Sequence, residues 1–146
     1  MDLVRRDAIK LTLDGARLML DAGTQRAAAI GVPMDIAVVD DAGVLLAFVR
    51  MDGAKLTSVD IAINKAFTAA GTRKGTHEYA ATAGAGGPAF GIHASNGGRF
   101  TIFGGGLPVI VDGQCVRGVG CSSGSAEQDR EVAQAAIDAL LAALEQ

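Results

Sequence analysis

The stretch from Gly97 to Asp129, GGRFTIFGGGLPVIVDGQCVRGVGCSSGSAEQD, decides the expected fold of this chain. Asp112-Gly113 lies between two apolar runs and indicates a β-hairpin, because both residues tolerate positive φ. The pattern Ser125-Ala-Glu-Gln128 fits a capping box and predicts that a helix begins there. Runs rich in β-branched and aromatic residues predict the strands of this stretch, at Phe100–Phe103, Leu107–Val111 and Cys115–Cys121.

The remaining elements follow from apolar periodicity and from turn residues. Asp40-Asp41-Ala42-Gly43 turns one apolar strand back on the next, and Gly31 followed by Pro33 ends the first helix. The predicted elements are a helical stretch over Asp2–Ile30, strands Met34–Asp40 and Val44–Arg50, a helix from Ser58 to about Arg73, a short helix near His77–Ala83 before a long irregular loop, and a helix over Ala126–Leu144. The order α-ββ-α-(α)-βββ-α predicts an α+β sandwich with a five-stranded antiparallel sheet and flanking helices, formed by one domain over residues 1–146.

Composition limits the classes of function. The chain has 146 residues, 49% of them hydrophobic, and only 13 lysines and arginines at a net charge of −3, which argues against an extended nucleic-acid interface. Charged residues interrupt every apolar run of the N-terminal MDLVRRDAIKLTL, so neither a signal peptide nor a membrane span is expected. Cys115 and Cys121 on one strand would lie ~20 Å apart, beyond disulfide reach, which favours a reducing, cytoplasmic setting.

Glycine is concentrated in the middle of the chain. Of the 20 glycines, 15 lie between Gly71 and Gly124. Glycine lets the backbone approach a ligand closely, so Gly105 is a candidate ligand contact. The triplet Gly104-Gly105-Gly106 lacks the Gly-Lys-Ser/Thr of a phosphate loop and precedes a strand, so a connection between strands is the simpler interpretation.

Several motifs in sequence order resemble the GlcG/HbpS-like family, a haem-binding-associated group whose domain also occurs at the C-terminus of PduO-type corrinoid adenosyltransferases. They are the Asp-Asp-Ala-Gly turn with the strand ending in Arg50-Met-Asp-Gly-Ala54, Lys65-Ala-Phe-Thr-Ala69, Gly104-Gly-Gly-Leu-Pro-Val109, Gly118-Val-Gly120 and Ser122-Ser-Gly124 with Asp129. The resemblance implies a profilin-like α+β fold, homo-oligomers and a ligand pocket. It also implies haem or a related tetrapyrrole as the ligand.

Two histidines are the candidate donors to a haem iron or metal. His77 is followed by Glu78, and because histidine titrates near neutrality the pair is also a candidate general acid and base. His93 lies in the glycine-rich approach to Phe100–Phe103 and is the second candidate. The plainer interpretations are a solvated helix start for His77 and an ordinary loop histidine for His93.

Basic residues are candidate binding groups for a carboxylate or a haem propionate. Arg50 ends a strand beside the start of a helix, and Arg99 and Lys65 are further candidates, since arginine binds carboxylates with two parallel hydrogen bonds. A surface salt bridge of Arg50 with Asp52 or Asp60 is an equally good interpretation. Lys65 lies on a face of small apolar residues, where an unpaired charge is costly, so it requires a partner in the protein or in a ligand.

Three functions remain open at this point. The first is binding of haem or a related tetrapyrrole, with His77 or His93 as axial donor and Arg50, Lys65 or Arg99 at the propionates. The second is a cofactor-independent lyase or isomerase, with His77 and Glu78 moving the proton and Arg50 and Arg99 binding the substrate carboxylate. The third is a pure interaction subunit of a homo-oligomer with no ligand.

Overall fold

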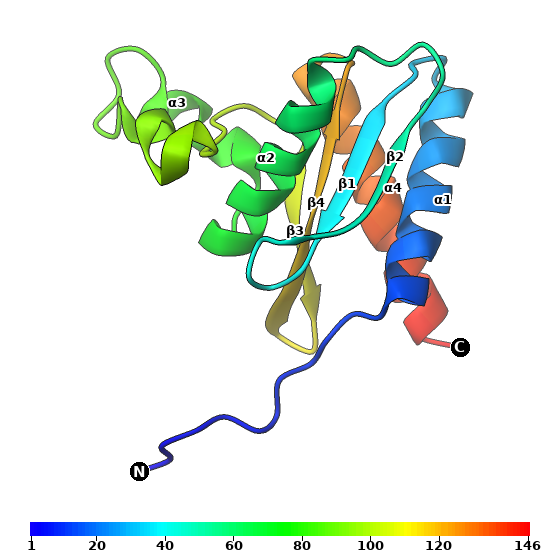
Figure 1. The fold of residues 1–146 in the computed structure, drawn as a ribbon, viewed down its shortest axis with the longest axis vertical. Helices are drawn as coiled ribbons and strands as arrows, with labels where there is room; N and C mark the ends of the chain where they lie inside the picture. The colour runs from blue at the N-terminus through cyan, green and yellow to red at the C-terminus, as the bar shows by residue number, and fades with distance from the viewer.

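The computed structural model describes residues 1–146 and contains a four-stranded antiparallel sheet with the strand order β2-β1-β4-β3. Helices cover both faces of the sheet: α1 and α4 lie side by side on one face and α2 lies on the other (Figure 1). The strands are β1 (Asp35–Val39), β2 (Leu45–Arg50), β3 (Gly106–Val111) and β4 (Gln114–Ser122). The helices are α1 (Leu13–Ala29), α2 (Ser58–Thr72), the single turn α3 (Ala80–Ala83) and α4 (Ala126–Leu144).

The two hairpins form where the sequence predicts them. Asp112 and Gly113 have φ values of 48° and 75°, as the tight turn between β3 and β4 requires. The capping box at α4 is also confirmed, since the Ser125 hydroxyl accepts from the Gln128 amide and the Gln128 side chain accepts from the Ser125 amide. These signals are local, so the sequence alone was sufficient to place them.

The predicted fifth strand at 100–103 is wrong, and the sheet has four strands. The segment lies against α2, where the Thr101 amide donates to the Thr68 hydroxyl at 2.9 Å. The Phe100 ring meets the Tyr79 ring edge to face, with 5.0 Å between centroids. A side chain of α2 therefore provides the bond that a neighbouring strand would have provided.

The first helix begins at Leu13 and not near Asp2. Thr12 caps it, because its hydroxyl accepts from the Gly15 amide. Upstream, the Gln114 side chain accepts from the Ile9 amide and donates to the Asp7 carbonyl. The backbone before Thr12 is thus bonded to the β3–β4 hairpin, which competes with an additional helical turn.

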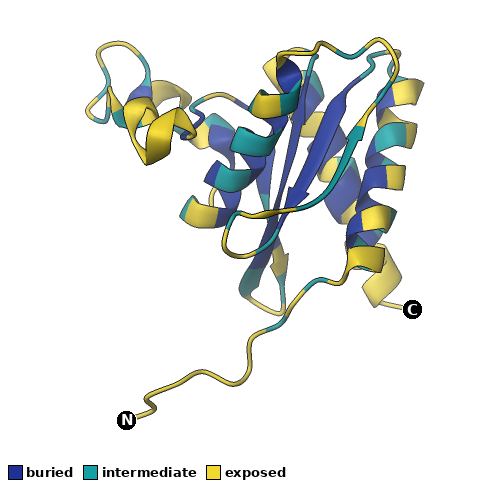
Figure 2. Ribbon diagram, viewed as in Figure 1, coloured by how far each residue is buried: buried dark blue, intermediate teal, exposed yellow.

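The sheet and the inner faces of the helices form the buried interior, while the segment around α3 projects from the body and is largely exposed (Figure 2). Between α2 and β3 the chain runs through the 3-10 turns Thr76–Tyr79, Ile92–Ala94 and Asn96–Gly98. This agrees with the predicted short helix followed by irregular structure. No helix combines the length and apolar character needed to cross a bilayer.

Candidate functional site

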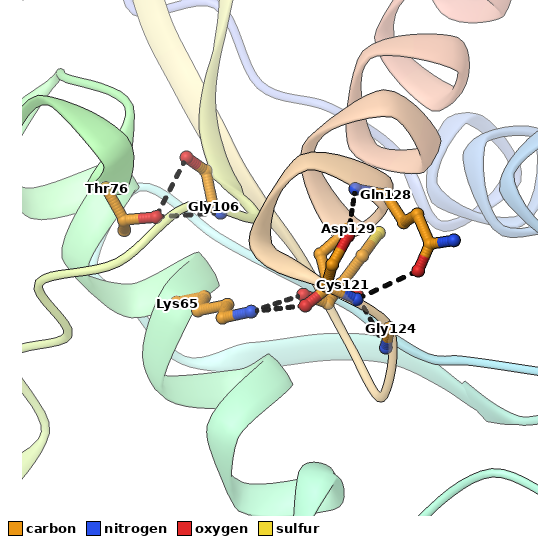
Figure 3. Close-up of polar contacts among 8 residues, drawn as sticks. Lys65, Thr76, Gly106, Cys121, Gly124, Gln128 and Asp129 are labelled. Atoms are coloured by element: carbon orange, nitrogen blue, oxygen red, sulfur yellow. Dashed lines mark hydrogen bonds and ion pairs between the residues drawn. The ribbon is translucent and has the colours of Figure 1, made fainter. Parts of the chain in front are cut away.

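A buried ion pair joins α2 to the start of α4. The Lys65 ammonium lies 2.8 Å from an oxygen of Asp129 and donates to the Cys121 carbonyl at 3.0 Å (Figure 3). The Lys65 side chain is 1% exposed and that of Asp129 is 3% exposed. The predicted need of Lys65 for a partner is confirmed, and the partners belong to the protein.

Gly105 closes over this pair. It has φ +126°, and a Cβ built there would lie 2.7 Å from the Lys65 ammonium and 2.6 Å from the Cys121 carbonyl oxygen. Only glycine fits this conformation without displacing the ion pair. The other Asp129 oxygen accepts from the Gly124 amide at 2.9 Å, so Asp129 also fixes the loop before α4. Gly105 as a contact to a ligand remains a prediction.

Aromatic rings of the segment between α2 and β3 pack on one another and on His93. The Tyr79 ring packs on that of Phe100, and the centroid of the Phe90 ring lies 5.8 Å from that of His93. Phe103 lies over the Lys65 ammonium at 5.0 Å. Phe90, Phe100 and Phe103 flank His93 in the sequence. Their rings supply flat apolar surfaces, although aromatic residues make up only 4% of the chain.

A cavity of about 410 Å³ lies between α2 and the projecting segment, and we call it the aromatic cavity. The exposed imidazole of His93 stands on its wall and forms no side-chain hydrogen bond within the chain. The cavity is lined by Ile61, Asn64, His93, Gly98, Phe100, Thr101, Ile102 and Phe103. Apolar walls with few polar groups are typical of small-molecule sites.

The predicted basic groups do not converge. The Arg99 guanidinium lies 3.9 Å from the centre of the Phe67 ring, and neither residue lines the aromatic cavity. Arg50 ends β2 directly opposite Asp35 in the strand register. Lys65 is buried in its ion pair. Of the three, Arg99 is the one whose neighbours in the sequence, Gly98 and Phe100, line the cavity that holds His93.

His77 lies in a different place, next to β3 and α4. Burial and the Arg130 charge lower the pKa of its imidazole, partly offset by Glu78. Its Nδ1 atom is buried without a hydrogen-bond partner. The Glu78 carboxylate accepts from the Gly75 amide at 2.8 Å and forms no hydrogen bond with His77. The cavity that His77 and Glu78 line includes neither Arg50 nor Arg99, so the groups of the predicted lyase are not assembled in one site.

Asp35 is a buried charged residue that no motif of the sequence predicts. Its side chain is fully buried at the start of β1, neither oxygen has a hydrogen-bond partner, and burial raises the pKa of the carboxyl. Its position after Met34 is typical of the polar edge of a strand, so no signal in the sequence marks it. Both cysteines are free, and burial raises the pKa of each thiol, which disfavours a nucleophilic role for Cys121.

Comparisons with known proteins agree with this architecture. Residues 11–138 match the family model described as haem degrading protein HbpS-like. An uncharacterized 15.0 kDa protein from the dhaT-dhaS intergenic region of Citrobacter freundii is 44% identical and covers 88% of this chain and 90% of its own length. The corrinoid adenosyltransferase PduO of the same organism is 33% identical over 93% of this chain, but only 41% of that protein is matched.

Solved structures give the same result. Protein ORFY of Klebsiella pneumoniae superposes with a TM-score of 0.93 at 38% identity, covering 97% of both chains. A structure of PduOC in complex with haem superposes with a TM-score of 0.86 at 34% identity, covering 90% of this chain and 95% of that one. The predicted resemblance is thereby confirmed. This chain belongs to the HbpS-like family.

Proposed function

We propose that this protein binds haem, or a closely related tetrapyrrole, in the aromatic cavity, with His93 as the axial donor. The observation that carries the proposal is the placement of an unbonded, exposed imidazole on the wall of an apolar, aromatic cavity of about 410 Å³. A related structure of the same family was solved as a haem complex, which supports the choice of ligand.

The residues present fit such a group. A haem needs flat apolar surfaces for the macrocycle, a nitrogen donor for the iron and cations for the propionates. Phe100, Phe103 and Ile61 provide the apolar surfaces, and His93 provides the donor. Arg99 follows Gly98, a residue of the cavity wall, and its guanidinium suits a carboxylate. Haem bound here would supply the iron chemistry, while the protein would hold and orient the macrocycle.

A titration of the purified protein with haemin, followed by absorbance, tests the proposal. We expect a saturable Soret shift in the natural protein and in His77→Ala, and binding at least about tenfold weaker in His93→Ala, because an axial bond is lost. His93→Gly with added imidazole should recover the ligated spectrum, which a merely structural role of His93 would not allow.

His77→Ala and His93→Ala are controls for each other, because His77 and His93 are the only two histidines of the chain. Circular dichroism first establishes that each variant is folded. A shift that persists in His93→Ala and disappears in His77→Ala would overturn the assignment of the site. Absence of a saturable shift in the natural protein would overturn haem binding altogether.

A further inference from the structure

We propose that a second site, around His77, binds a small carboxylic acid with an apolar body. We call it the His77 groove; its volume is about 300 Å³, at the lower end of the range for ligand sites. It is lined by Arg73, Lys74, Gly75, His77, Glu78, Leu107, Pro108, Ile110, Gln134, Ile137 and Leu141. None of these residues lines the aromatic cavity, so the inference does not depend on the proposed haem site.

One wall of the groove is apolar. It is formed by side chains of β3 and α4, two elements that pack against each other at the open edge of the sheet. Ile110 and Leu141 line the groove and are 41% and 36% exposed. The apolar part of a ligand in the groove would cover these side chains. Transfer of an alkyl or aryl group from water to this wall is favourable in proportion to the area covered.

The other wall is positively charged. Arg73 and Lys74 line the groove, and Arg130 of α4 lies close enough to His77 to lower the pKa of its imidazole. None of these three cations has a carboxylate within 4.0 Å, although the Lys74 ammonium lies 5.9 Å from the centre of the Tyr79 ring, outside the groove. The one acid of the groove, Glu78, already accepts from the Gly75 amide.

His77 adds a polar group between these walls. The imidazole packs directly on Gly75, because a Cβ there would collide with its ring. The lowered pKa favours the neutral ring at neutral pH, and because Nδ1 is buried, Nε2 is the ring nitrogen left to hydrogen-bond with a ligand. An anionic ligand would therefore be held by the flanking cations, with the imidazole as a hydrogen-bonding group.

These features select one ligand class. An apolar wall opposite Arg73 and Lys74, which have no carboxylate partner, matches a monocarboxylate with a hydrophobic body. A short acid such as acetate leaves the wall uncovered, and a neutral alcohol leaves the cations unpaired.

Isothermal titration with octanoate tests the proposal, with 1-octanol and acetate as matched probes that each lack one feature. We expect saturable octanoate binding, and octanol and acetate at least about tenfold weaker. Arg73→Gln should weaken octanoate binding about tenfold, since a charge-assisted hydrogen bond to the carboxylate is lost. Arg17→Gln, which removes a positive charge from exposed α1, should leave it unchanged.

A spectroscopic readout locates the ligand. Octanoate should move the imidazole proton resonances of His77 and leave those of His93 in place. Octanoate binding that is insensitive to Arg73→Gln, or that moves His93 in place of His77, would overturn the His77 groove as the site. Lack of saturation would overturn it as well. A haem titration remains interpretable in each case, because His77→Ala and His93→Ala separate the two sites.

Discussion

At the scale of single residues, the two buried carboxylates, Asp129 and Asp35, differ in whether their charge is compensated. Asp129 accepts from both the Lys65 ammonium and the Gly124 amide, so its charge is compensated. Asp35 is equally buried and has no hydrogen bond, although Arg50 lies across from it in the strand register. Burying a charge is costly unless it is paired and hydrogen-bonded, so the ionised Asp35 side chain lowers the stability of the folded protein.

Replacing Asp35 by Asn is expected to stabilise the protein by roughly 1 kcal/mol at pH 7, because the neutral amide removes the cost of burying an unpaired charge but remains a polar group without a partner. Burial raises the pKa of Asp35 above its ordinary value of 3.8, so the folded state binds its proton more tightly than the unfolded state does. The destabilisation therefore develops as the pH rises from 3.8 through the raised pKa, and it is absent at lower pH.

Denaturant unfolding of both proteins at pH 7 and near pH 3.5 measures this difference. Asp21→Asn, on the exposed face of α1, is the control and should change stability by less than about 0.5 kcal/mol. A gain from Asp35→Asn that is as large at low pH as at pH 7 would contradict the assignment to an ionised carboxyl.

At the scale of elements, small residues determine how closely α2 approaches the sheet. Gly118 and Gly120 of β4 face Ala62 and Ala66 of α2, and a Cβ on either glycine would overlap a carbonyl oxygen of the helix. Backbone packs on backbone at this contact, which holds Lys65 at the depth where it meets Asp129. The alanines of α2 and the glycines of β4 therefore form the two halves of this close contact.

Gly120→Ala is expected to destabilise the protein by about 1–3 kcal/mol, the usual cost of overpacking. The new methyl group would overlap the Ala62 carbonyl and lie 2.5 Å from the Ala66 nitrogen, and neither backbone atom can move without shifting α2. Thermal and denaturant unfolding measure the change.

Gly71→Ala is the matched control for this substitution. Gly71 lies in the last turn of α2 without a positive φ, and a Cβ added there would have no atom within 4 Å. Alanine there should stabilise the helix by up to about 1 kcal/mol. Equal effects of the two substitutions would show that backbone propensity, and not the contact with α2, explains them.

At the scale of the whole molecule, the sheet and α2 separate two hollows of different chemistry. The aromatic cavity lies between α2 and the projecting segment, whereas the His77 groove lies along β3 and α4. No residue is shared, and Lys65 and Asp129 form a rigid buried link between α2 and α4. The two proposed ligands should therefore bind without competition.

With saturating haemin, the dissociation constant of octanoate is expected to stay within about twofold of its value without haemin. Coupling would require one ligand to change the protein's affinity for the other, and the buried link between α2 and α4 offers no second arrangement that could do so. Octanoate titrations with and without one equivalent of haemin measure the coupling. Mutual exclusion of the two ligands would indicate a single shared site.

Much of the fold could be predicted because its signals are local. The turn at Asp112-Gly113, the capping box at Ser125 and the amphipathic pattern of α4 depend on residues only a few positions apart. The family resemblance rests on the same short motifs. The boundary of α1 and the segment 100–103 were predicted wrongly because distant groups, Gln114 and the Thr68 hydroxyl, bind those backbones.

The sequence by itself therefore determined the order of elements apart from the strand expected at 100–103, both hairpins and the need of Lys65 for a partner, because propensity, turn geometry and charge burial act on neighbouring residues. Only the tertiary structure decided which partner Lys65 meets, that His77 and His93 occupy separate hollows, and that few aromatics suffice to line one cavity. Each of these features joins residues that are far apart in the sequence, and such residues become neighbours only when the helices pack on the sheet.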